Sequence, residues 1–128
     1  MKEIILVFAG GGIGSVARYL LSRWVSSWHQ HPFPLGTLVV NIVACVVLGA
    51  SLEYMALRGG VSQHARLLLA VGFCGGFSTF STFSHESIAL YQQGNYITLA
   101  MYIVMSVALC MAAVWLGSWA AGRFVSGG

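Results

Sequence analysis

Four runs of apolar residues, each long enough to cross a lipid bilayer, constrain this chain more than any other feature. They cover about residues 4–24, 35–55, 67–90 and 96–120, and short loops separate them. A membrane-spanning helix needs about 20 apolar residues. Of the 128 residues, 58% are hydrophobic and 7% are charged, whereas about a quarter of the residues in soluble domains are charged. We predict one all-α domain over residues 1–128, an integral membrane protein with four transmembrane helices and both termini on one side.

The third apolar run is interrupted at its centre by small and polar residues. Residues 72–84 read Gly-Phe-Cys-Gly-Gly-Phe-Ser-Thr-Phe-Ser-Thr-Phe-Ser. Paired glycines weaken a helix, because glycine loses the most backbone entropy when it is ordered. We therefore predict that the third helix is broken near residues 75–79. Backbone groups freed at membrane depth need a partner from protein, water or an ion. The break should therefore be buried, and it should bind one of these partners.

The few charged residues and the cysteines exclude several classes of function. The formal net charge of +3 rests on six basic and three acidic residues, which form no basic patch, so nucleic acid is not indicated. On one side of the membrane we expect four basic residues, Lys2, Arg58, Arg66 and Arg123, and on the other side two, Arg18 and Arg23. This weak bias does not fix one orientation. The cysteines form no C-x-x-C pair, and we expect them to be small buried residues with neither a disulfide nor a metal role.

The polar residues of the first two runs each allow a packing and a functional interpretation. The first run does not complete the dinucleotide-binding pattern G-x-G-x-x-G, so we expect Gly10 and Gly14 to let another helix approach closely. Arg18 either snorkels to the interface or is a cation at an aqueous entrance that attracts anions. Asn41 either joins two helices by a hydrogen bond or donates its N–H group to an anion.

The last two runs carry a further set of candidate residues. Phe80 and Phe83 lie on one face of a helix, where their positive ring edges could stabilise a small anion beside hydroxyl donors; they could equally be core filling. Glu86 could be a gate, a structural acceptor or an interfacial charge. Tyr102, Ser106 and Cys110, spaced four residues apart, place two hydroxyls and a thiol along one face, and this polar stripe is either packing or one wall of a narrow path.

Together these residues resemble the small dual-topology fluoride channels, the Fluc or CrcB family. The resemblance covers essentially the whole chain and includes Arg18, Asn41, the sequence Gly-Gly-Phe-Ser-Thr-Phe-Ser-Thr-Phe-Ser at residues 75–84, and Glu86. It implies a channel, not an enzyme, that exports fluoride passively from the cytoplasm across the bacterial inner membrane and confers fluoride resistance. Two chains would pair antiparallel in the lipid bilayer, with two pores in each homodimer.

The resemblance also implies roles for individual residues. The residues expected along the fluoride path are Phe80, Phe83, Asn41, Ser81, Thr82, Tyr102, Ser106 and Thr37. Arg18 would lie in the vestibule, and Glu86 at a gate or at the edge of the pore. The main-chain carbonyls of Gly75 and Ser78 from both chains would bind a structural Na⁺ ion. Cys110 stands where the family often has a hydroxyl.

Three other classes of function remain as alternatives. A small four-helix, proton-coupled multidrug exporter needs a titratable carboxylate deep in the bundle, for which Glu86 is the candidate. A membrane enzyme could use His85 and Glu86 with His64, but adjacent residues point to different helix faces, and no nucleophile accompanies them. A purely structural subunit would leave the broken helix unexplained.

Overall fold

The computed structural model describes all 128 residues, and every regular element in it is a helix. The elements are α1 (Lys2–Trp28), α2 (Leu35–Arg58), α3 (Gln63–Arg66), the π-helical segment η1 (Leu67–Cys74), α4 (Gly75–Phe77), α5 (Phe80–Gln92) and α6 (Tyr96–Ser126). The elements from α3 to α5 follow one another as the third span. Four segments are long and apolar enough to cross a membrane, which confirms the predicted all-α membrane fold.

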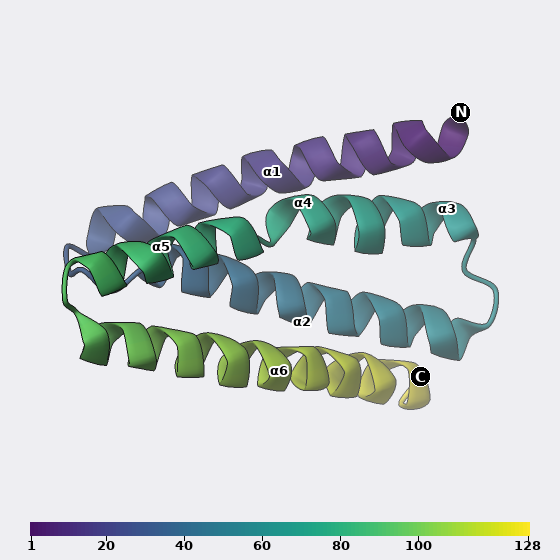
Figure 1. The fold of residues 1–128 in the computed structure, drawn as a ribbon. Coiled ribbons are helices and arrows are strands. Elements are labelled where there is room, and N and C mark those ends of the chain that lie inside the picture. The colour runs from purple at the N-terminus through teal and green to yellow at the C-terminus, as the bar shows by residue number, and fades with distance from the viewer.

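The four spans form a bundle in which two helix pairs pack most closely. The largest contacts join α2 to α6 and α1 to η1. Figure 1 shows α2 and α6 running in the same direction, with α1 and the third span running the opposite way, and both chain termini lie at the same end. The prediction that both termini lie on one side is therefore confirmed.

Glycines allow α1 to lie directly against the third span. A Cβ atom added at Gly10 would overlap a carbonyl oxygen of η1, and one added at Gly14 would overlap the carbonyl oxygen of Phe73. From the other side, a Cβ atom at Gly76 would overlap the carbonyl oxygen of Gly11. Small residues at such interfaces let helix backbones approach closely in membranes. The packing interpretation of the glycines in the first run is confirmed.

Helices α2 and α6 also meet at glycines. A Cβ atom at Gly49 would overlap the carbonyl oxygen of Val114, and one at Gly117 would overlap that of Val46. The hydroxyl of Ser118 donates a hydrogen bond of 3.1 Å to the carbonyl oxygen of Gly49. These contacts fix the register of the two parallel helices along their length.

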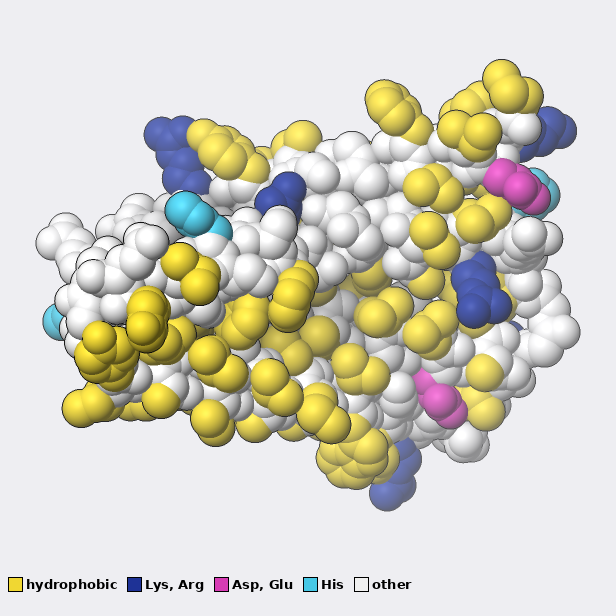
Figure 2. All heavy atoms as spheres, viewed as in Figure 1, with side chains coloured by type: hydrophobic (Ala, Val, Ile, Leu, Met, Phe, Trp, Pro, Cys, Tyr) yellow, Lys and Arg dark blue, Asp and Glu magenta, His cyan; other side chains and the backbone are white.

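The outer surface of the bundle is apolar. Large hydrophobic side chains such as Phe8, Ile97 and Trp115 are 82%, 80% and 67% exposed. In Figure 2 hydrophobic side chains cover the lower part of the visible face, where α6 lies, and the charged side chains are few. Such a surface suits lipid, since soluble monomers rarely expose contiguous apolar patches of this kind. The chain is a multi-pass membrane protein.

The third helix is broken at Ser78 and Thr79. Both residues have extended backbones, with φ and ψ of −75° and 157° at Ser78 and of −149° and 112° at Thr79. The break falls at the end of the predicted region and not at the glycines, because Gly75 is helical, with φ −65° and ψ −38°. Gly76 serves close packing instead. The first half of this span therefore ends where the Thr79 hydroxyl caps the following helix. It does not end at the glycines, where the loss of backbone entropy would weaken the helix.

Candidate functional site

The amide side chain of Asn41 holds the break in the third helix. Its Nδ2 group donates to the carbonyl oxygen of Thr79 at 3.1 Å, and its Oδ1 atom accepts from the Thr79 amide at 2.8 Å. One side chain thus satisfies both polar backbone groups of Thr79, which would otherwise be unpaired at membrane depth. The packing interpretation, in which Asn41 joins two helices by hydrogen bonds, agrees with this contact. Its amide retains a second N–H group, so donation to an anion stays a prediction.

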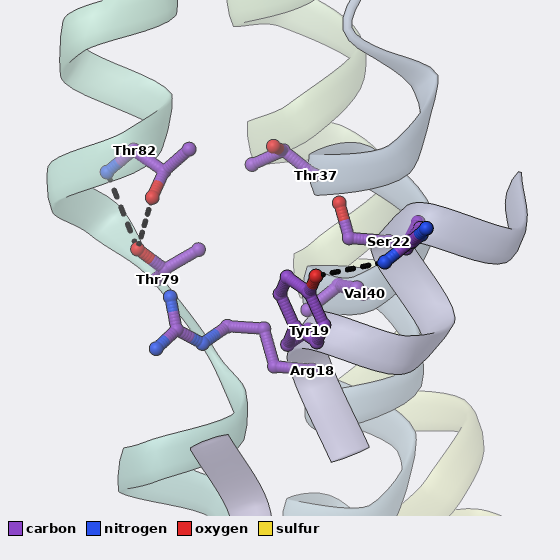
Figure 3. A pocket seen from close by; sticks show the side chains of 8 residues that line it. Arg18, Tyr19, Ser22, Thr37, Val40, Thr79 and Thr82 are labelled. Carbon is purple, nitrogen blue, oxygen red and sulfur yellow. Dashed lines mark hydrogen bonds between the residues drawn. The ribbon is translucent and has the colours of Figure 1, made fainter. Parts of the chain in front are cut away.

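The hydroxyl of Thr79 organises the start of α5. Its Oγ1 atom accepts from the backbone amide of Thr82 at 3.2 Å and donates to the Thr82 hydroxyl at 2.9 Å, as the dashed lines in Figure 3 show. The hydroxyl of Ser81 lies 3.3 Å from the same atom. Ser81 is exposed, whereas Thr79 is buried. Thr79 is therefore the N-cap of α5 and the centre of a small hydroxyl cluster.

A polar cavity of about 340 Å³ lies between α1, α2 and the break. Its lining consists of Arg18, Tyr19, Ser22, Arg23, Thr37, Val40, Thr79 and Thr82. Figure 3 shows Arg18 extending from α1 toward Thr79, and its Nε atom donates to the carbonyl oxygen of Gly76 at 3.2 Å. Arg23 donates to the Tyr19 hydroxyl at 3.0 Å. Because two guanidinium groups and no carboxylate line this cavity, its potential favours anions.

Glu86 is a hydrogen-bond acceptor for two hydroxyl groups. Its Oε1 atom accepts from Thr37 at 2.8 Å, and its Oε2 atom accepts from Tyr102 at 2.7 Å. The three residues come from α5, α2 and α6, so one carboxylate joins three helices. Tyr102 is fully buried. Of the three sequence-based interpretations of Glu86, this geometry matches the structural acceptor.

A second, mostly apolar cavity of about 260 Å³ lies on the other side of the break. It is lined by Asn41, Cys45, Ser78, Thr79, Phe80, Phe83, Ser106, Val107 and Cys110. The ring centroids of Phe80 and Phe83 are 5.5 Å apart, and that of Phe83 lies 5.0 Å from the Tyr102 ring. Phe80 is 78% exposed. Ser106 is buried, and its hydroxyl has no hydrogen-bond partner in the chain.

Most residues predicted for an ion path fall in these two cavities. Thr79 lines both, so the cavities meet at the break. Ser81 and Tyr102 are the exceptions, since they line neither cavity: Ser81 is exposed, and Tyr102 is fully buried. Sequence reasoning missed the central place of Thr79 and the contribution of Arg23. The sequence did contain a signal for this N-cap, because Thr79 has a hydroxyl and stands three residues before Thr82 at the start of a helical run.

Three carbonyl groups at or just before the break are free of hydrogen bonds, although the Thr79 carbonyl accepts from Asn41 and the Gly76 carbonyl from Arg18. Within the chain, no N–H or O–H group donates to the carbonyl oxygen of Gly75, Phe77 or Ser78. The Ser78 hydroxyl instead donates backward to the carbonyl of Cys74 at 2.8 Å. Gly75 and Ser78 are both exposed on the single chain. Two of the three free carbonyls are those expected to bind Na⁺, and a hard cation fits such oxygen donors.

The fold and the cavities define a class: a four-span membrane protein with a broken helix whose interior suits a small anion. The sequence model of the family described as CrcB-like protein, Camphor Resistance (CrcB) matches residues 5–118. The chain belongs to this family.

Curated relatives match nearly the whole chain. A protein of Rhizobium etli (strain CIAT 652) is 46% identical over 114 residues, which cover 89% of this chain and 91% of the relative. A protein of Phocaeicola vulgatus is 44% identical over 119 residues, or 93% of this chain and 98% of the relative. A protein of Geobacter metallireducens is 40% identical over 117 residues, or 91% and 94%. Each of these relatives is named fluoride-specific ion channel FluC.

Proposed function

We propose that this chain forms a fluoride-selective channel that exports F⁻ passively from the cytoplasm and thereby confers fluoride resistance. The observation that carries the proposal is the cavity at the broken helix, where Phe80 and Phe83 lie with the unpaired hydroxyl of the buried Ser106. The names of the relatives, which describe fluoride-specific channels, support the same choice of ion.

The lining of this cavity suits fluoride chemically. Fluoride is small and strongly hydrated, so a narrow path must replace its water with other donors. Hydroxyl groups, the second N–H of Asn41 and the positive edges of the phenylalanine rings are such donors, and none of them carries a full charge. Conduction requires binding that is weak enough for the ion to leave. The arginines line the wider cavity next to it, where they attract anions without holding them in the narrow part.

The direction of transport follows from acid–base chemistry and membrane potential. Hydrogen fluoride is neutral, so it crosses lipid from acidic surroundings and dissociates in a near-neutral cytoplasm. The trapped anion needs only a passive exit, because a negative interior drives it outward by about 2.3 kcal/mol per 100 mV. A channel without an energy source is sufficient for this task.

We also propose that two chains pair antiparallel, with two pores in each homodimer and one structural Na⁺ ion between them. The exposed ring of Phe80 and the exposed Gly75 and Ser78 support a second chain at this face. Four free carbonyls, two from each chain, would hold the ion, which would give these oxygens the partner that the chain itself does not supply. The test is ion content: the purified dimer should contain Na⁺, and the chains should separate when Na⁺ is replaced by a large organic cation.

The proton-coupled exporter has less support than the channel. Such an exporter needs a carboxylate that binds and releases protons or cations during transport. Both oxygens of Glu86 already accept hydroxyl hydrogen bonds, so neither is free to take up a transported proton or cation without breaking a contact between helices.

The experiment that tests the function uses liposomes containing only the purified protein. With the voltage clamped by a potassium ionophore, they should release fluoride and retain chloride, with no requirement for a proton gradient. Equal release of chloride would exclude the selectivity, and a strict proton requirement would favour the exporter.

A further inference from the structure

Two cysteines from different helices share the wall of the apolar cavity. Cys45 lies on α2 and Cys110 on α6, both line the cavity of about 260 Å³, and both are partly buried. The third cysteine, Cys74, is buried in η1 and does not line this cavity. All three are free thiols.

The register of α2 and α6 brings the two cavity thiols face to face. Gly49 lies one turn after Cys45, and Val114 lies one turn after Cys110. A Cβ atom at Gly49 would overlap the carbonyl oxygen of Val114, so the two helices touch at this level. Because the helices are parallel (Figure 1), moving back one turn on each places Cys45 opposite Cys110.

We propose that Cys45 and Cys110 form a binding site for a soft divalent metal ion, of which Hg²⁺ is the probe. Thiolates are the preferred protein ligands of soft metal ions. On binding, each thiol loses its proton and forms one sulfur–metal bond, so that one ion joins two sulfurs and two protons are released. Two thiolates balance the charge of a divalent ion, and the neutral complex avoids leaving a net charge at membrane depth.

The small number of ligands defines the class of metal. No group of three or more His, Cys, Asp or Glu residues in the chain could hold a metal ion together. A structural zinc site needs four protein ligands and a catalytic one needs three, so the pair does not suit Zn²⁺. An ion that accepts two sulfur ligands is the one that fits. For Cys45 and Cys110 this proposal departs from the sequence-based expectation that the cysteines have no metal role.

Metal binding at this site should stop ion movement, a consequence that rests on the proposed function. The cavity wall that holds the two thiols also holds Phe83 and the unpaired hydroxyl of Ser106. An ion between the sulfurs would occupy the space beside both groups. Micromolar Hg²⁺ should therefore block fluoride release from liposomes, and an added dithiol should restore it.

The test measures metal binding and fluoride release separately on the full-length purified protein. Mass spectrometry of the intact protein should find one Hg²⁺ per chain at this site. Loss of even an outer-shell partner weakens metal binding about ten- to a hundredfold, so Cys45→Ser and Cys110→Ser should each weaken it at least about tenfold. Cys74→Ser, the matched control, should bind as the wild type does.

The outcomes separate the metal site from the proposed function. Unchanged Hg²⁺ binding in the double variant Cys45→Ser/Cys110→Ser, or loss of binding in Cys74→Ser, would overturn the site. Binding through the pair in a protein that releases no fluoride would uphold the site and reject the channel. Fluoride release that Hg²⁺ blocks equally in the double variant would show that the block arises elsewhere, and would overturn the consequence drawn for this cavity.

Discussion

Replacing Asn41 by alanine should loosen the break in the third helix, because Asn41 satisfies both backbone groups of Thr79. Interhelical hydrogen bonds in membranes contribute about 0.6 kcal/mol on average and about 1.7 kcal/mol at most. Two lost bonds therefore correspond to about 1–3 kcal/mol. At a factor of ten for each 1.4 kcal/mol, local opening should become about 5- to 150-fold more frequent. The expected result is faster amide hydrogen exchange at Thr79 and lower stability to denaturation in detergent micelles.

Two further variants test whether the effect comes from the hydrogen bonds between Asn41 and Thr79. Asn41→Asp keeps an oxygen that accepts from the Thr79 amide but loses the donor to the Thr79 carbonyl, so protection of that amide should largely persist. Ser84→Ala is the matched control, since its hydroxyl bonds only to Phe80 within the same helix. If Asn41→Ala leaves exchange at Thr79 unchanged, Asn41 does not hold the break, and its role must lie elsewhere.

The remaining predictions concern packing, the dimer face and the carboxylate. Gly14→Val should unfold or destabilise the bundle, since a Cβ atom there would overlap the third span; Gly12→Val, with nothing within 4 Å, is its control in a micelle unfolding assay. A Cβ atom added at Gly75 has no atom of another segment within 4 Å, so Gly75→Val should change the stability of the single chain little while it reduces the dimer fraction in cross-linking. An intact dimer would remove this face from the interface. Glu86→Gln keeps one accepting oxygen and replaces the other with an NH₂ group, so one of the two hydroxyl hydrogen bonds should be lost at a cost of about 0.5–1.5 kcal/mol and the unfolding midpoint should fall. An unchanged midpoint would mean that Glu86 is not a structural acceptor.

The fold was predictable from the sequence because bilayer thickness converts the length of an apolar run directly into a helix. The position of the break was less predictable. Gly75 and Gly76 indicated it by backbone entropy, yet both are helical, and the hydroxyl cap of Thr79 decides where the second half begins. The π-helical geometry of η1 has no counterpart in the sequence pattern.

The contacts of the site could not be predicted, because they join residues far apart in the chain. Thr37 and Glu86 are 49 positions apart, and only the packing of α2 against α5 brings them together. The same holds for Asn41 and Thr79, which are 38 positions apart. The polar residues were identifiable as candidates, but which of them would pair and which would remain free, as Ser106 does, depends on the assembled bundle.

The most direct test of the proposed path is the rate of fluoride release from liposomes containing Ser106→Ala, compared with Ser118→Ala. Both serines lie on α6, but the Ser118 hydroxyl donates to Gly49, whereas that of Ser106 has no partner in the chain. A hydrogen bond to a charged group contributes about 1.5–3 kcal/mol, so losing it should slow release about tenfold or more in Ser106→Ala and leave Ser118→Ala near the wild-type rate. Equal rates in the two variants would place the fluoride path outside this cavity.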